Sequence, residues 1–202
     1  LQCVEDYADI GLPTAAESFL LMESDGASSV VDGEAAQMQA IAESHGALEV
    51  KVAGDALEAD RLAAARRTAF AALARIKPTT ILEDVTVPRS ELAGVVRFVQ
   101  QVADDLNLEV ANFGHMGDGN LHPTFLTNET DAEEMERVET AMKKIFDRTI
   151  EVGGTITGEH GVGLAKKPYL PGQFNDYSYP LLKEIKRAMD PSGRLNPGKI
   201  FE

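Results

Sequence analysis

The chain has 202 residues and a formal net charge of −14. Nucleic acid is excluded as a partner, because phosphate neutralisation requires clustered Lys and Arg. Hydrophobic residues make up 44% of the chain and charged residues 26%, which excludes a disordered polypeptide. No run approaches the roughly 18 consecutive apolar residues of a membrane span, and no basic-then-apolar stretch marks an export signal.

Two features of the N-terminal region bear on where the protein works. The lone Cys3 has no partner for an internal disulfide, which suits a reducing compartment. We therefore expect a cytoplasmic protein, with peripheral attachment to the inner face of the membrane as an alternative. The first residue is Leu1, so we expect the chain to be part of a longer polypeptide.

The first part of the chain is predicted to alternate strands and helices. Apolar and β-branched runs indicate the strands, helical spacing of apolar residues indicates the helices, and Gly46, Pro78 and Pro88 punctuate them. The expected strands are residues 17–24, 48–52 and 79–87, and the expected helices are residues 32–45 and 60–74.

The second part of the chain contains the two most strongly amphipathic helices. One is capped by Ser90 and extends to Leu106, and the other follows a predicted Thr130–Glu133 capping box and ends at Gly153. The remaining predicted elements are strands at 108–113, 122–127 and 155–157 and a last helix at 180–189.

This order of elements predicts an α+β fold. Each main helix is apolar on one side only, so it is able to cover a sheet while its acidic side faces water. The connections resemble the split βαβ arrangement of ferredoxin-like folds. We therefore expect one domain, a ferredoxin-like sandwich with helices packed on an antiparallel or mixed sheet.

Three of the four histidines lie in two Gly-rich segments, GHMGDGNLH at 114–122 and GEHGVG at 158–163. The separation of His115 and His122 would place them on opposite faces of a straight strand, but the Gly-Asp-Gly turn between them removes this restriction. Both imidazoles are then able to face one point and bind a divalent metal, with Glu159 as a third ligand. Such a His/His/carboxylate set with open positions is typical of a catalytic site.

A purely structural interpretation stays open for these segments, with glycines forming tight turns and histidines bonding to backbone carbonyls. His45, the fourth histidine, precedes Gly46 at a predicted helix end, where a hydrogen bond to the last turn accounts for it. Neither Gly-rich segment fits the strand, G-x-G-x-x-G and helix unit that binds dinucleotides.

Three segments, at 114–122, 158–170 and 190–199 (DPSGRLNPGK), resemble the C-terminal domain of FAD-linked oxidases of the vanillyl-alcohol oxidase type. This family includes the flavin subunit of glycolate oxidase and the D-lactate and D-2-hydroxyglutarate dehydrogenases. The resemblance implies that residues 1–202 are a cap and substrate domain of ferredoxin-like fold. It also implies a separate N-terminal FAD-binding domain that this chain lacks, without which the fragment is expected to be inactive.

The resemblance also implies roles for individual residues. Its metal ligands are His115, His122 and Glu159, its catalytic base is His160, and the helix residue Arg66 binds the substrate carboxylate. Asn120 matches a position that contacts substrate and flavin, and Asn196 matches a position beside the flavin. Lys166 matches a lysine without an assigned role, and a plain surface lysine is an equal alternative.

Relatives that oxidise 2-hydroxyglutarate carry a lysine near the position occupied here by Ile81 and Leu82. Phe70, one helical turn after Arg66, adds a further apolar group. Because a second buried carboxylate without a partner would cost several kcal/mol, a monocarboxylic 2-hydroxy acid is favoured.

We therefore predict a flavoprotein oxidoreductase that converts a D-2-hydroxy acid of the glycolate or D-lactate type to the 2-oxo acid, with hydride transfer to FAD. The expected cofactors are FAD and a divalent metal: zinc, manganese or iron. The expected partners are the FAD domain and either an iron-sulfur electron-acceptor subunit or a second copy of the chain. The alternatives are a metal-dependent hydrolase and a non-catalytic ferredoxin-like binding module.

Overall fold

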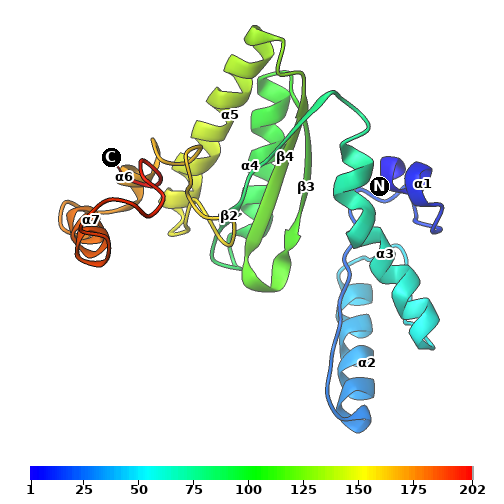
Figure 1. The fold of residues 1–202 in the computed structure, drawn as a ribbon. Coiled ribbons are helices and arrows are strands. Elements are labelled where there is room, and N and C mark those ends of the chain that lie inside the picture. Colours follow the sequence, from blue (N-terminus) through cyan, green and yellow to red (C-terminus); the bar gives the residue numbers. More distant parts are fainter. Residues whose placement is uncertain (202) are drawn as a thin grey trace. The chain divides into compact units, whose positions relative to one another are not determined.

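The computed structural model describes residues 1–201, which form two compact units (Figure 1). The first unit comprises Leu1–Ile76 and the second begins at Lys77. No helix in the described part of the chain is both long and apolar enough to cross a membrane.

The first unit is helical, with α1 (Gln2–Ala8), α2 (Ser28–Ser44) and α3 (Ala56–Leu73). The side chain of Asp55 caps α3 by accepting a hydrogen bond from the Glu58 N–H at 2.8 Å. The first unit buries few apolar residues: Val4, Ala65, Ala72 and Leu73. The two predicted helices are confirmed, and Gly46 follows the end of α2 with a φ of 84°.

The strands predicted at 17–24 and 48–52 are wrong. Both segments are irregular in the structure, and several of their apolar side chains, including Leu20 and Leu48, are exposed. An apolar run becomes a strand only where a neighbouring strand pairs its backbone N–H and C=O groups. The described part of the first unit contains no strand that provides this pairing.

The second unit contains an antiparallel sheet of β1 (Thr79–Leu82), β2 (Val85–Thr86), β3 (Glu109–His115) and β4 (Asn120–Thr127). Strand β4 is central, with β3 along one edge and both β1 and β2 along the other. Thr155 extends the sheet by bridging Thr86, so the strand predicted at 155–157 is reduced to one pair.

The strand predicted at 79–87 is interrupted, and Pro123 explains the interruption. The pairs Leu82–Thr124 and Val85–Leu121 share one register, so β1 and β2 are two parts of one strand. Between them, the Glu83 N–H donates to the Pro123 carbonyl at 2.9 Å, but proline has no N–H to return a bond. The ladder is therefore broken at Glu83 and Asp84.

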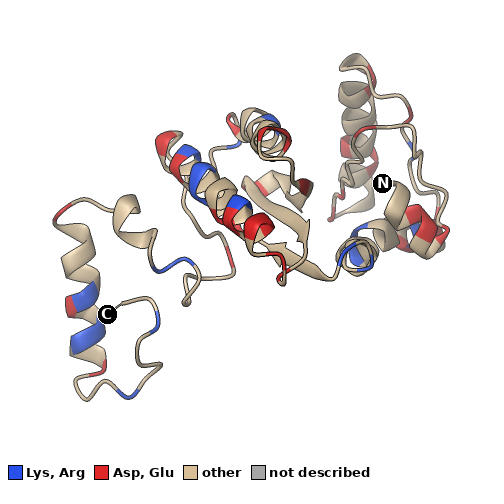
Figure 2. Ribbon diagram, turned by 90° about the horizontal axis from the view of Figure 1, so that it is seen from above, with Lys and Arg blue, Asp and Glu red and all other residues tan. Residues whose placement is uncertain are grey.

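One face of the sheet is covered by α4 (Leu92–Asp105) and α5 (Ala132–Glu151) (Figure 1). These helices and the sheet form a continuous apolar core, whose buried members include Val85, Val95, Val99, Leu121, Phe125, Val138, Ile145 and Phe146. The solvent side of α5 carries both signs of charge (Figure 2) and includes the pair Lys143–Asp147.

The predicted helix caps are wrong at both main helices. Glu91 occupies the cap position of α4 without a side-chain hydrogen bond, so Ser90 does not cap it. Asp131 caps α5 by accepting from the Glu134 N–H at 3.0 Å. The Thr130 hydroxyl instead donates to Asn128 Oδ1 at 2.8 Å.

The order of the elements in the second unit is β1/β2, α4, β3, β4, α5 and the Thr155 bridge. This is the βαββαβ succession of ferredoxin-like folds. The predicted α+β class, with helices packed on an antiparallel sheet, is confirmed. A short helix, η1 (Met116–Asp118), joins β3 to β4, and α6 (Leu170–Gln173) and α7 (Ser178–Met189) follow.

Candidate metal centre

The hairpin of β3 and β4 places two histidines on one face of the sheet. His115 is paired with Asn120 and Phe113 with His122, and side chains of directly paired residues share a face. Leu121 and Phe125 alternate with these residues and point into the core beneath α4 and α5. The histidines therefore lie on the face opposite the two helices.

Gly119 makes the tight connection between these strands possible. Its φ is 73°, and a Cβ at this position would lie 2.1 Å from the Val87 carbonyl oxygen. Only glycine satisfies both constraints. The turn therefore returns the chain so that His115 and His122 face one point, as the Gly-Asp-Gly sequence indicates.

Glu159 completes the cluster from a loop of the second Gly-rich segment. Its Oε1 lies 3.3 Å from the Nε2 of His115 and 3.3 Å from the Nε2 of His122. The two imidazole rings meet edge to face, with their centroids 5.5 Å apart. One ligand atom from each of the three residues lies within 4.8 Å of the others, so the structure brings the predicted metal ligands together.

His122 is the most deeply buried member of this cluster. Burial lowers the pKa of His122, and this effect exceeds the opposing attraction of the Asp84 carboxylate. The imidazole is therefore neutral at physiological pH and has a lone pair to offer a metal. Its Nδ1 lies 3.8 Å from Asp84 Oδ1.

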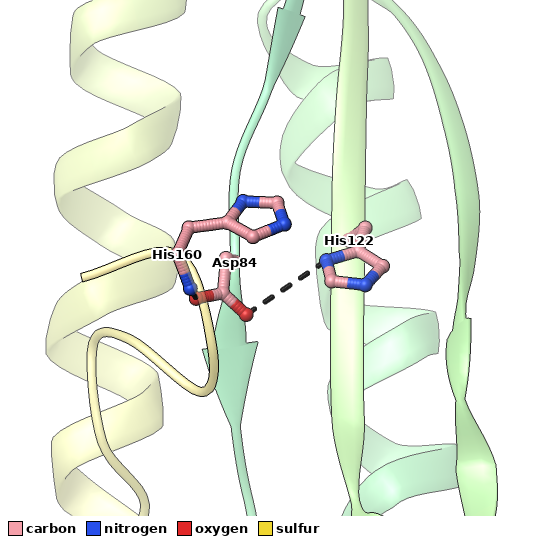
Figure 3. A group of neighbouring side chains, drawn as sticks. All are labelled: Asp84, His122 and His160. Atoms are coloured by element: carbon pink, nitrogen blue, oxygen red, sulfur yellow. Dashed lines mark hydrogen bonds and ion pairs between the residues drawn. The ribbon is translucent and has the colours of Figure 1, made fainter. Parts of the chain in front are cut away.

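His160, the predicted base, lies beside the cluster. Its ring stacks on that of His122 with a centroid distance of 5.0 Å and an interplanar angle of 5°. Its Nε2 lies 3.8 Å from Glu159 Oε1, and its side chain is exposed. Figure 3 shows His160 turned towards Asp84 and His122 from its loop. Its ring is thus next to the three predicted ligands and accessible to a small molecule.

Asp84 is a functional candidate that sequence reasoning missed. Its side chain is fully buried, and its two oxygens accept hydrogen bonds from Asn120 and from the loop that contains Glu159 and His160. Burial raises the pKa of Asp84, but the hydrogen bonds outweigh burial and hold the pKa well below its usual range. The sequence indicates a role for Asp84 in one way, because it places an acidic residue inside a predicted strand rich in β-branched residues.

Asn120 lies between Asp84 and a small cavity. Its Nδ2 donates to Asp84 Oδ1 at 2.6 Å and to the Val85 carbonyl at 3.1 Å, while its buried Oδ1 has no hydrogen-bond partner among the described residues. The cavity has a volume of about 340 Å³. It is lined by Thr86, His115, Asp118, Asn120, Gly158 and Glu159.

Lys166 is buried, so the interpretation as a plain surface lysine is wrong. Its Nζ donates to the Asp84 backbone carbonyl at 2.6 Å and lies 3.5 Å from Glu83 Oε2. Burial lowers the pKa of Lys166, and the charge of Glu83 opposes this shift. The lysine therefore joins the chain just after the second Gly-rich segment to Glu83 and Asp84 of the sheet.

Two further predicted site residues belong to other parts of the chain. Arg66 is an exposed residue of α3 in the first unit, and Asn196 is an exposed turn residue with a φ of 47°. The Asn196 carbonyl accepts from the Lys199 N–H at 3.2 Å. Their proposed contacts with substrate and flavin stay predictions.

Fold and site together define an α+β unit whose sheet carries histidines and a carboxylate on the face opposite its helices. Residues 1–200 match the family model described as FAD linked oxidases, C-terminal domain, and the chain belongs to this family. The resemblance expected from the three sequence motifs is thereby confirmed.

Several curated relatives are similar to the chain over most of its length. It is 49% identical over 201 residues to the glycolate oxidase subunit GlcD of Bacillus subtilis, covering 100% of this chain and 43% of that protein. It is 39% identical over 199 residues to GlcD of Escherichia coli, covering 98% of this chain and 40% of that protein. It is 30% identical over 187 residues to the probable mitochondrial D-lactate dehydrogenase of Danio rerio, covering 91% of this chain and 37% of that protein. The chain thus spans about two fifths of the length of these relatives.

Proposed function

We propose that the chain is the metal- and substrate-binding domain of an FAD-dependent D-2-hydroxy acid oxidoreductase of the glycolate or D-lactate type. The observation that carries this proposal is one carboxylate oxygen of Glu159 lying 3.3 Å from a nitrogen of each of two histidines. The names of the glycolate oxidase and D-lactate dehydrogenase relatives support the substrate class, and the family supports FAD. Family membership also favours an oxidoreductase over a hydrolase or a non-catalytic module.

The separations in the cluster fit a bound divalent ion. At 3.3 Å they exceed the usual N–H···O hydrogen bond of about 2.7–3.2 Å. Two ligands that each lie about 2.0–2.1 Å from a tetrahedral ion are about 3.3–3.4 Å apart, which matches the structure. Two imidazole nitrogens and one carboxylate suit zinc, manganese or iron, and His115, His122 and Glu159 would hold the ion.

The residues of this chain would prepare the substrate for oxidation. A bound divalent ion supplies Lewis acidity, which lowers the pKa of the substrate hydroxyl. His160, whose side chain is exposed, is proposed to accept the hydroxyl proton at its Nε2, which lies 3.8 Å from Glu159 Oε1. Arg66 is proposed to bind the substrate carboxylate from the first unit, which would fix the orientation of the α carbon.

FAD is proposed to bind mainly to a domain outside this chain, because the chain covers 43% of the B. subtilis relative. Asn120 lines the cavity, and its buried Oδ1 has no partner among the described residues, so we propose that this oxygen accepts a hydrogen bond from a ligand there. Asn120 and Asn196 are the proposed contacts of this chain with flavin. When bound, FAD supplies the hydride acceptor.

The cavity favours a substrate with a single carboxylate. Its lining includes the carboxylates of Asp118 and Glu159 but, among the described residues, no lysine or arginine. Side chains alternate between the two faces of the sheet along this strand. Leu82 therefore points to the same face as Asp84 and the histidines, whereas Ile81 points to the other face and packs against the core. Of these two positions, Leu82 is therefore the one retained in the proposal.

Two further partners belong to the proposal. The name of the B. subtilis relative describes it as a subunit of glycolate oxidase, which supports assembly with other chains, such as an iron-sulfur electron acceptor or a second copy. We also propose that the protein works in the cytoplasm or peripherally at the inner face of the membrane.

The test of this function is oxidation of 2-hydroxy acids by the protein expressed with the FAD domain. Glycolate, D-lactate, L-lactate and D-2-hydroxyglutarate are compared, with an artificial electron acceptor. We expect the flavin to be reduced by glycolate or D-lactate and activity to be lost on removal of the metal with a chelator. A metal-loaded flavoprotein that none of these acids reduces would contradict the proposal.

A further inference from the structure

We infer that Asp84 is a positioning residue, whose carboxylate holds the segment from Thr157 to His160 so that Glu159 and His160 face the histidines of the hairpin. This inference rests on the proposed metal-binding role of Glu159. It assigns to Asp84 a task that differs from ligation.

The carboxylate of Asp84 is the point at which this segment meets the sheet. Its Oδ2 accepts four hydrogen bonds, and its Oδ1 accepts one from Asn120 at 2.6 Å. The donors to Oδ2 are the Thr157 hydroxyl at 2.8 Å and the backbone N–H groups of Gly158 at 2.8 Å, Glu159 at 3.0 Å and His160 at 2.9 Å.

The segment has few other means of fixing its conformation. Residues 157–160 belong to neither a helix nor a strand. Their backbone donors point at one buried anion, and hydrogen bonds to an ionised acceptor are about twice as strong as neutral ones. Because the N–H groups of Glu159 and His160 are both held, the directions in which their side chains leave the backbone are held as well.

Gly158 allows the close approach that these bonds require. A Cβ at this position would lie 2.2 Å from the Asn120 Nδ2 and 2.3 Å from the Thr86 Oγ1. The backbone therefore contacts the edge strand directly, at a distance that other residues do not permit. The glycine and the aspartate act together to bring the loop onto the sheet.

Asp84 also forms a second cluster of possible metal ligands with His122 and His160. One ligand atom from each of these three residues lies within 4.8 Å of the others. Oδ1 accepts one hydrogen bond, but ligation through Oδ2 would compete with the four that this oxygen accepts. Four donors converge on Oδ2, and the donor to Oδ1 is at 2.6 Å. Anchoring of the loop accounts for the four bonds to Oδ2, whereas ligation through this oxygen would leave loop donors without an acceptor.

The experiment measures Co²⁺ binding by the metal-free protein expressed with the FAD domain, by absorption and competition with a chelator. Asp84→Asn keeps the size of the side chain but presents an amide to the loop. We expect its affinity for Co²⁺ to fall about tenfold to a hundredfold, the range typical of residues that orient ligands. Thr157→Val removes one donor, keeps the carboxylate and should lower the affinity about threefold. Both variants should reach the wild-type stoichiometry and Co²⁺ spectrum at saturation.

Asp190→Asn is the matched control. Asp190 is another buried aspartate that accepts backbone N–H bonds, from Arg194 and Leu195 at 2.9 Å each, and none of its contacts is a site residue. Its substitution should leave the Co²⁺ affinity unchanged. If Asp84→Asn fails to fold, Thr157→Val carries the test alone.

Unchanged Co²⁺ affinity in both Asp84→Asn and Thr157→Val would overturn the inference, and so would a loss of affinity in Asp190→Asn equal to that in Asp84→Asn. A third contrary result is a changed Co²⁺ spectrum at saturation in Asp84→Asn while Thr157→Val has no effect. The last pattern would identify Asp84 as a ligand. Failure of the wild-type protein to bind Co²⁺ would instead contradict the proposed function itself.

Discussion

The two segments that build the site are held by different means. His115 and His122 belong to paired strands, so the ladder between β3 and β4 fixes their positions. Glu159 and His160 lie in an irregular loop that is held by a carboxylate 75 and 76 residues away in the sequence. The comparison teaches that half of the site is as stable as the sheet, whereas the other half depends on a few polar contacts at the sheet edge.

This difference separates two kinds of substitution. A change at a core-facing residue of the hairpin, such as Leu121 or Phe125, alters the fold and the site together, because the strands that carry the histidines also form the core. A change in the contacts of the loop is expected to alter the site while most of the core remains packed. The predictions below test this separation, from the largest expected effect to the smallest.

Lys166→Met should have the largest effect, a loss of about 3–5 kcal/mol in the free energy of unfolding at neutral pH. The substitution leaves the buried carboxylate of Glu83 without its cation, which lies 3.5 Å away in the wild type. The measurement is denaturant unfolding, and Glu83→Gln in the same chain should restore much of the loss. An equal loss in the double variant would show that the ion pair is not the cause.

The deficit of Lys166→Met should also depend on pH. Burial raises the pKa of Glu83, and the charge of Lys166 opposes this shift, so the pKa rises further without the lysine. A carboxyl whose folded-state pKa is raised destabilises the fold as pH rises through that pKa. The deficit should therefore shrink as pH falls through the raised pKa of Glu83, and a deficit independent of pH would contradict this account.

Gly158→Ala should displace the loop and leave the hairpin in place. The added Cβ would lie 2.2 Å from the Asn120 Nδ2, and overpacking of this kind costs about 1–3 kcal/mol. Affinity for a divalent metal should fall about tenfold, the low end for residues that orient ligands. Gly117→Ala is the control, because a Cβ there meets no atom within 4 Å. Equal affinities of the two variants would count against the close approach as a requirement.

Leu82→Lys should have the smallest effect, a shift of about tenfold in kcat/KM from D-lactate towards D-2-hydroxyglutarate, which corresponds to about 1.4 kcal/mol. Leu82 lies on the site face of the sheet, so a lysine there is able to pair with a second substrate carboxylate. Ile81→Lys should instead lower stability, because Ile81 packs against the core. An unchanged ratio in a Leu82→Lys protein that retains flavin and metal would remove the argument for a monocarboxylate.

The sequence predicted the elements whose cause is local. The periodicity of Val95, Val99, Val138 and Ile145 identified the two helices that cover the sheet, and the Gly-Asp-Gly turn identified the hairpin. Apolar content alone failed at residues 17–24, because a strand also needs a partner. The same reason explains the interruption of the predicted 79–87 strand, which Pro123 causes from another strand.

The candidate site was predictable only in part, for a related reason. The unusual residues of the Gly-rich segments singled out His115, His122, Glu159 and His160, which the structure brings together. Asp84 carries no such mark, since its importance arises from contacts with residues 36 to 76 positions away. The burial of Lys166 likewise follows from long-range packing against Glu83 and Asp84.

The most direct test of the central claim is the metal content of the protein with and without His122. The wild-type protein, expressed with the FAD domain, should bind about one divalent ion per chain, and His122→Ala should bind at least about a hundredfold more weakly, because it loses a neutral buried ligand. His45→Ala should match the wild type, since the exposed His45 side chain bonds to Ser44 and to the Ile41 carbonyl at the end of α2. Equal metal content in wild type and His122→Ala at limiting metal concentration would contradict the account.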